Sequence, residues 1–88
     1  MSQKVKIINK LGMHLRAAAV FIKTANLFKA DVTVEHQKKK INGKSIMGLM
    51  ALAAGNGTEL VIHTKGADAK RCLDELTKLV SNRFGESE

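Results

Sequence analysis

Two hydrophobic periodicities alternate along this chain of 88 residues, and they constrain its fold more than any other feature. Apolar residues at every second position, as at Val5 and Ile7, indicate a strand with one buried face. Apolar residues three and four positions apart, as at Ala18, Phe21 and Ile22, indicate a helix with one buried stripe. The patterns follow the order strand, helix, strand, strand, helix, strand, helix, which predicts an α+β protein.

The predicted elements are short and are separated by turn residues. The expected strands are residues 3–8, a stretch around Val32 and Val34, a short strand that ends near Ile41, and residues 58–64. The expected helices cover residues 15–27, residues 45–52, and about sixteen residues along the last apolar stripe. That last stripe consists of Ala69, Cys72, Leu73, Leu76, Leu79 and Val80. The connections are predicted at Gln37-Lys38, Asn42-Gly43 and Gly55-Asn56-Gly57.

Few strands with helices between them predict one sheet, antiparallel or mixed, with its helices on one face. This is an open-faced sandwich, and the patterns alone leave the strand order open. A chain of 88 residues has room for one core, so we expect a single domain over residues 1–88. Its composition, 44% hydrophobic and 26% charged, is that of a folded domain.

Composition and charge narrow the functional classes. No apolar run is long enough to cross a bilayer, and no signal peptide is evident, so we expect a cytoplasmic protein with no membrane association. The net charge of +7 favours acidic partners. An aromatic content of 3%, without Tyr or Trp, argues against nucleic acid, because unpaired bases stack on aromatic rings. His14, His36 and His63 lack metal-ligand spacing, so we expect neither a metal nor a cofactor.

His14 is the strongest candidate for chemistry, because it stands where a helix begins. No Ser, Thr, Asp or Asn precedes Leu15, so the first backbone N–H groups are expected to lack a side-chain acceptor. A phosphoryl group on His14 would provide one, close to Arg16 and the positive end of the helix dipole. We also expect a backbone carbonyl to hold the other ring nitrogen and set the tautomer. The plainer interpretation is a surface histidine beside a solvated arginine.

The stretch from Asn9 to Ala18 resembles the active-site pattern of the HPr family, Asn-x-x-Gly-x-His-x-Arg-Pro-Ala. The matching residues are Asn9, Gly12, His14, Arg16 and Ala18. The resemblance extends over the chain in length and element order, and implies a four-stranded antiparallel sheet covered by three helices. It also implies a carrier rather than an enzyme: His14 accepts phosphate from enzyme I, itself phosphorylated by phosphoenolpyruvate, and donates it to IIA proteins, while Arg16 stabilises the phosphate.

Ala17 departs from the family pattern, which has proline at this position. In the first turn of a helix proline lacks an N–H that is unpaired in any case, so alanine keeps the helix and adds a donor. We expect the fold to be kept. The placement of Arg16 and the lifetime of the phosphohistidine are the properties that the substitution can change.

Ser45 lies in a second motif, Asn42-Gly43-Lys44-Ser45-Ile46-Met47-Gly48. A phosphate-binding P-loop is rejected, since that motif needs glycine where Lys38 stands. Taken alone, Ser45 is a good helix N-cap. The stretch also resembles the regulatory-serine motif of HPr proteins that are substrates of HPr kinase/phosphorylase, which implies a phosphorylation that slows transfer at His14. The two roles are compatible.

Apolar residues next to these two sites are candidates for partner contacts. They are Met13, Leu15, Ile46, Met47 and Met50, whereas Leu49 and Leu52 are expected in the core. We expect a monomer. The alternative function is a regulatory binding module that acts mainly through Ser45. The resemblance implies that non-carrier relatives lack this histidine, so the presence of His14 argues against the alternative.

Overall fold

The computed structural model describes residues 1–52 and 54–88, and the order of its elements confirms the predicted order. In chain order these are β1 (Ser2–Lys6), α1 (Leu15–Ala25), β2 (Asp31–His36), β3 (Lys39–Asn42), α2 (Ile46–Ala51), β4 (Glu59–Lys65), α3 (Ala69–Ser81) and a 3-10 turn η1 (Arg83–Gly85). The predicted turn between β2 and β3 is also present. Its two residues, Gln37 and Lys38, have φ values of 49° and 68°, which suit a tight hairpin.

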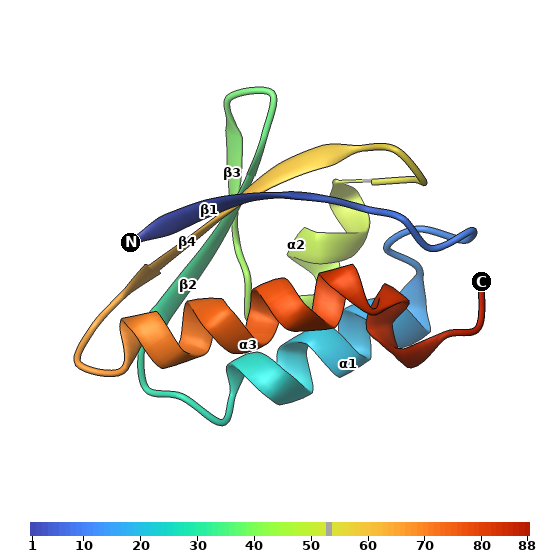
Figure 1. The fold of residues 1–88 in the computed structure, drawn as a ribbon. Coiled ribbons are helices and arrows are strands. Elements are labelled where there is room, and N and C mark those ends of the chain that lie inside the picture. The colour runs from blue at the N-terminus through green and yellow to red at the C-terminus, as the bar shows by residue number, and fades with distance from the viewer. Residues whose placement is uncertain (53) are drawn as a thin grey trace.

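The four strands form one sheet in the order β1-β4-β2-β3, and every neighbouring pair is antiparallel. The sequence patterns did not determine this strand order. β4, late in the sequence, lies between β1 and β2, so the two edges are β1 and β3. The helices lie together on one side of the sheet, with α1 and α3 side by side (Figure 1). The fold is therefore the predicted open-faced sandwich.

The core lies between the helices and the inner face of the sheet. α1 contributes Ala17, Ala18 and Phe21, while α3 contributes the predicted stripe, of which Leu79 is only partly buried. Small residues on α1 let the helix pack closely against its neighbours α2 and α3. Cys72 is fully buried, as predicted for a small core residue. No helix of the described residues has both the length and the apolarity that crossing a membrane requires.

Both long helices end earlier than predicted. α1 stops at Ala25, and the next residues form a tight turn in which Leu27 and Phe28 donate to carbonyls three residues back, at 3.1 and 3.2 Å. α3 has 13 residues rather than about sixteen, because Arg83 and Phe84 take positive φ values of 62° and 56°. This left-handed turn reverses the chain and buries the Phe84 ring.

The reversal brings the C-terminal tail back to the loop that precedes α1. The N–H of Lys10 donates to the carbonyl of Glu88 at 2.5 Å, and Figure 1 shows the C-terminus beside this loop. Residues at the two ends of the sequence therefore meet at the start of α1.

Candidate functional site

The loop before α1 is fixed by a close backbone approach at Gly12. Its φ is +69°, and a Cβ atom there would lie 2.4 Å from the carbonyl oxygen of Ala54 and 2.7 Å from Cα of Gly55. Only glycine fits such a position without strain. The next N–H, that of Met13, donates to the same Ala54 carbonyl at 2.8 Å. This contact buries Met13 and sets the direction in which His14 leaves the loop.

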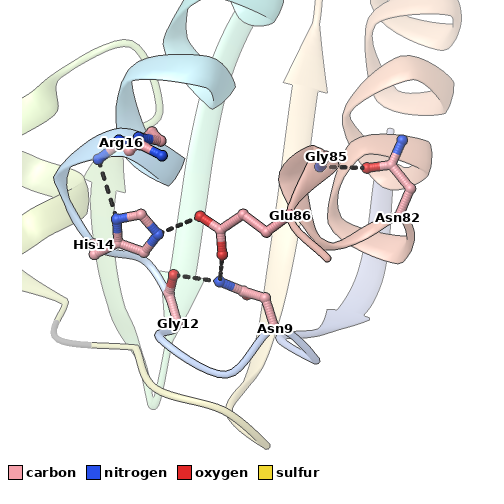
Figure 2. A network of polar contacts seen from close by, with 7 residues as sticks. All are labelled: Asn9, Gly12, His14, Arg16, Asn82, Gly85 and Glu86. Carbon is pink, nitrogen blue, oxygen red and sulfur yellow. Dashed lines mark hydrogen bonds and ion pairs between the residues drawn. The ribbon is translucent and has the colours of Figure 1, made fainter. Parts of the chain in front are cut away.

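His14 is itself the N-cap of α1. Its backbone is extended, with φ −80° and ψ 178°, and its Nδ1 accepts a hydrogen bond from the Arg16 N–H at 3.2 Å (Figure 2). Its carbonyl accepts from the Ala18 N–H at 2.9 Å. The expectation that no side chain accepts from this helix start is therefore wrong: the imidazole does so. Among the described residues, the N–H of Ala17 has no acceptor.

The other ring nitrogen of His14 faces a carboxylate and not the predicted carbonyl. Nε2 contacts Oε2 of Glu86, and the other carboxylate oxygen accepts from Asn9 Nδ2 at 2.9 Å (Figure 2). The expected backbone carbonyl is thus replaced by a side chain 72 positions away in the sequence. Because Nδ1 accepts from a backbone N–H, the ring proton belongs on Nε2, where it can donate to Glu86.

Opposing effects set the charge state of Glu86. Burial raises the pKa of its carboxyl, but the hydrogen bonds from Asn9 and His14, together with the positive charges of His14 and Arg16, hold that pKa below its ordinary value of 4.5. Glu86 is thus a carboxylate at neutral pH. The exposed Arg16 guanidinium lies on the same side, so the site combines a cation, helix N–H groups and one built-in anion.

Ser45 occupies the equivalent position at the start of α2. Its Oγ accepts from the Gly48 N–H at 3.1 Å, which confirms the predicted N-cap. The residue is half-buried, and α2 packs against α1. The two candidate sites thus lie on neighbouring helices.

The predicted partner-contact residues divide into one that is buried and four that are accessible. Met13 is only 5% exposed because the turn at Gly12 directs it into the core, so its prediction as a contact residue is wrong. The side chains of Leu15, Ile46, Met47 and Met50 are 60%, 38%, 79% and 41% exposed. Leu49 and Leu52 are buried, as predicted. Leu11 is also exposed, beside His14, and sequence reasoning did not select it.

Sequence reasoning missed Glu86 and gave Asn9 no role beyond its match to a pattern. A glutamate in a short polar tail gives no periodic signal. The one available hint was that Glu86 and Glu88 are acids at the end of a chain whose net charge is +7. Of the described residues, no group of three or more His, Cys, Asp and Glu side chains is placed to hold a metal ion.

Comparison with known proteins shows which family shares this arrangement. Residues 1–82 match the family model described as "PTS HPr component phosphorylation site". The phosphocarrier protein HPr of Neisseria meningitidis is 48% identical over 88 residues, covering 100% of this chain and 99% of that protein. The chain belongs to the HPr family. The relatives from Neisseria meningitidis and Pseudomonas aeruginosa are named phosphocarrier protein HPr, and the family model names the phosphotransferase system.

Solved structures agree with this HPr assignment. An HPr from Thermoanaerobacter tengcongensis superposes with a TM-score of 0.96 at 36% identity, covering 100% of this chain and 99% of the other. A second HPr structure from that organism, with a TM-score of 0.79 and 39% identity over 93% of this chain and 94% of the other, is a dimer. The family fold, a four-stranded antiparallel sheet with three helices, is therefore confirmed here.

Proposed function

We propose that this HPr-family chain accepts a phosphoryl group from enzyme I on His14 and donates it to IIA proteins. The observation that carries the proposal is the position of the ring: His14 caps α1 with Nδ1 turned to the helix N–H groups, while Nε2 is occupied by Glu86. The lone pair that can attack is therefore that of Nδ1, which carries no proton and accepts only the hydrogen bond from the Arg16 N–H. Cytoplasmic location and a monomeric carrier are part of the same proposal.

Backbone N–H groups at the start of α1 and the Arg16 guanidinium can stabilise a phosphoryl group on His14. On Nδ1 it lies at the positive end of α1, within reach of the Arg16 and Ala17 N–H groups. Attack of Nδ1 breaks the hydrogen bond from the Arg16 N–H and frees that donor for a phosphoryl oxygen. The Arg16 guanidinium supplies a charge-assisted contact. The protein thus positions the group and leaves the bond chemistry to its partners, as expected of a carrier and not of an enzyme.

The exposed apolar side chains around His14 support contacts with more than one partner. Leu15 on α1 and Met47 on α2 are the most accessible of the predicted contact residues. Methionine adapts to different surfaces, which suits a carrier that meets both a donor and an acceptor. The net charge of +7 favours association with acidic faces.

Phosphorylation of Ser45 by HPr kinase/phosphorylase is the proposed control. A phosphate there adds negative charge on a helix that neighbours α1, and so opposes docking of an acidic partner at His14. Regulation requires no change of fold, because an anion at the Ser45 position still faces the α2 N–H groups.

Incubation with enzyme I and phosphoenolpyruvate tests the function. We expect one acid-labile phosphate per chain in the wild type and none in His14→Ala, whose CD spectrum stays that of the wild type. Labelled phosphate that persists in His14→Ala would contradict the proposal. Labelling by HPr kinase at Ser45 with no transfer from enzyme I would instead support the alternative, a regulatory module that acts through Ser45.

A further inference from the structure

The carboxylate of Glu86 bridges a buried residue and the proposed phosphoryl acceptor. Its Oε1 accepts from Asn9 Nδ2 at 2.9 Å, and its Oε2 faces Nε2 of His14 (Figure 2). The side chains of Glu86 and His14 are 20% and 26% exposed, so solvent screens this contact only in part. The three side chains form a linear series from the protein interior to the imidazole.

Asn9 is held in one orientation by its own hydrogen bonds. It is fully buried, and its Nδ2 donates both to Glu86 and to the Gly12 carbonyl, at 2.9 and 2.8 Å. Its Oδ1 is buried and has no partner among the described residues. Turning the amide over would point Oδ1 at two acceptors, so the observed orientation is the only one that satisfies them. An unpaired buried acceptor is unfavourable for stability, so the two hydrogen bonds that Nδ2 donates are what hold Asn9 in this orientation.

The backbone that carries Glu86 is also strained and anchored. Arg83 and Phe84 both have left-handed φ values, a conformation that is uncommon for residues other than glycine. The Phe84 ring is buried in the core, and Asn82 Oδ1 accepts from the Gly85 N–H at 3.2 Å. Glu86 therefore starts from a fixed point and does not swing freely on a loose tail.

We propose that Asn9 and Glu86 are a pair of positioning residues for phosphoryl transfer: Asn9 holds the Glu86 carboxylate, which holds the His14 ring with its proton on Nε2 and with Nδ1 open to the phosphoryl group. This proposal rests on the proposed function of His14. Glu86 acts through the imidazole, and Asn9 acts through Glu86.

The bond changes explain why a carboxylate at Nε2 is useful. As Nδ1 forms its bond to phosphorus, the bond from phosphorus to the donor's leaving atom breaks, and that atom keeps the electron pair. The proton on Nε2 stays, so the phosphorylated ring becomes a cation. Glu86 lies against that cation and stabilises it without taking the proton. In the reverse direction the protonated ring is the better leaving group.

The first test is the state of the ring itself, which needs no partner protein. Proton NMR of wild-type protein with ¹⁵N-labelled imidazole is expected to show a slowly exchanging Nε2 proton at low field. Glu86→Ala removes this resonance and Asn9→Ala weakens it. Glu88→Gln, which removes another tail acid, keeps it. If Glu86→Ala retains the resonance unchanged, the positioning role is wrong.

The second test is which nitrogen is phosphorylated by phosphoramidate, a small donor that releases ammonia. Wild-type protein and Glu88→Gln are expected to carry phosphate on Nδ1. Glu86→Ala leaves Nε2 open, so a share of the product on Nε2 is expected, and the two isomers are separated by chromatography after alkaline digestion. The same isomer ratio in Glu86→Ala and in the wild type would contradict the proposal.

The third test is the rate of transfer from phosphorylated enzyme I. We expect the initial rate to fall about tenfold or more in Glu86→Ala and in Asn9→Ala, because a displaced nucleophile reacts slowly. The double variant is expected to be no slower than the slower single variant, since both act through one contact. Fully additive losses would show that Asn9 acts independently of Glu86, and would overturn the pair.

The three tests distinguish failure of the positioning role from failure of the proposed function. If wild-type protein takes no phosphate from enzyme I, the proposed function fails, while the NMR and phosphoramidate results still decide the role of the pair. Asn9 is fully buried, so its variant can lose stability, whereas Glu86 is partly exposed in the tail and its variant is expected to stay folded. The result for Glu86→Ala therefore decides the proposal even if Asn9→Ala does not fold.

Discussion

The helices α1 and α2 both begin at a residue whose side chain caps the helix, but the two caps are held in different ways. Ser45 makes its capping contact to Gly48 within its own helix. His14 caps α1 through Nδ1, and its second nitrogen is held by Glu86 from the far end of the chain. The hydroxyl completes its role locally, whereas the imidazole depends on tertiary structure.

This difference fits two kinds of chemistry. A serine that caps a helix is modified from outside by a kinase and needs no prepared nucleophile. A histidine that accepts a group from one partner and gives it to another needs a defined tautomer and orientation. Of these two sites, His14 is the one whose orientation is set by a long-range contact.

The largest expected effect is that of a negative charge at Ser45 on the rate of phosphoryl transfer to His14. Ser45→Asp places a negative charge on α2, and we expect the rate of transfer from enzyme I to fall about tenfold or more, because like charges slow docking. Ser45→Ala, which adds no charge, is expected to transfer as the wild type does. Stopped-flow or quench measurements at low and high salt check this.

A charge added elsewhere is the control for this effect. Gln37→Asp adds the same charge in the β2–β3 hairpin, which projects away from the helices (Figure 1). Its transfer rate is expected to stay close to that of the wild type. Equal slowing by Ser45→Asp and Gln37→Asp would show that net charge alone, and not the position of Ser45, controls transfer.

The second prediction concerns stability, for which substitution of Ser45 by alanine is expected to have a larger effect than substitution of His14. Ser45→Ala removes a capping hydroxyl and is expected to lower the free energy of unfolding by about 1 kcal/mol, or the Tm by roughly 4–8 °C. His14→Ala removes a capping contact of 3.2 Å and the contact with Glu86, both made by a partly exposed ring, and is expected to cost less than half as much. Urea unfolding at pH 7 measures both.

Ser45→Asp serves as the matched variant, since aspartate also caps helices. It is expected to unfold within about 0.5 kcal/mol of the wild type, although its transfer is slow. A loss of stability in His14→Ala that equals the loss in Ser45→Ala would contradict the view that the His14 cap serves chemistry more than stability.

Local patterns were sufficient for the elements and for the Ser45 site. The period-two and helical patterns located the strands and helices, because one face of each element is buried. The N-cap at Ser45 was predictable because it involves only residues within one turn. The ends of α1 and α3 were not predicted. The turn that stops α3 depends on burial of Phe84, a tertiary contact that no local pattern contains.

The candidate site at His14 was predictable only in part. The position of His14 and Arg16 at a helix start followed from the local sequence and the family resemblance. The burial of Met13 did not, because it depends on the approach of Gly12 to Ala54. The contact between His14 and Glu86 spans 72 positions and appears only when the chain end folds back.

The smallest expected effect is the pH dependence of the contact that sets His14 apart from Ser45. Hydrogen bonds and nearby cations outweigh burial and hold the pKa of Glu86 below 4.5, so its contribution to stability is present above that value and is lost as the pH falls through the lowered folded value. We therefore expect the wild type to exceed Glu86→Gln in free energy of unfolding at pH 7, and this difference to shrink steadily in urea titrations below pH 4.5. Glu88→Gln, whose carboxylate lies 3.8 Å from Lys10 in an exposed pair, is expected to match the wild type at pH 7. A difference between wild type and Glu86→Gln that is constant from pH 7 into the acid range would show that the Glu86 charge does not hold the tail against His14.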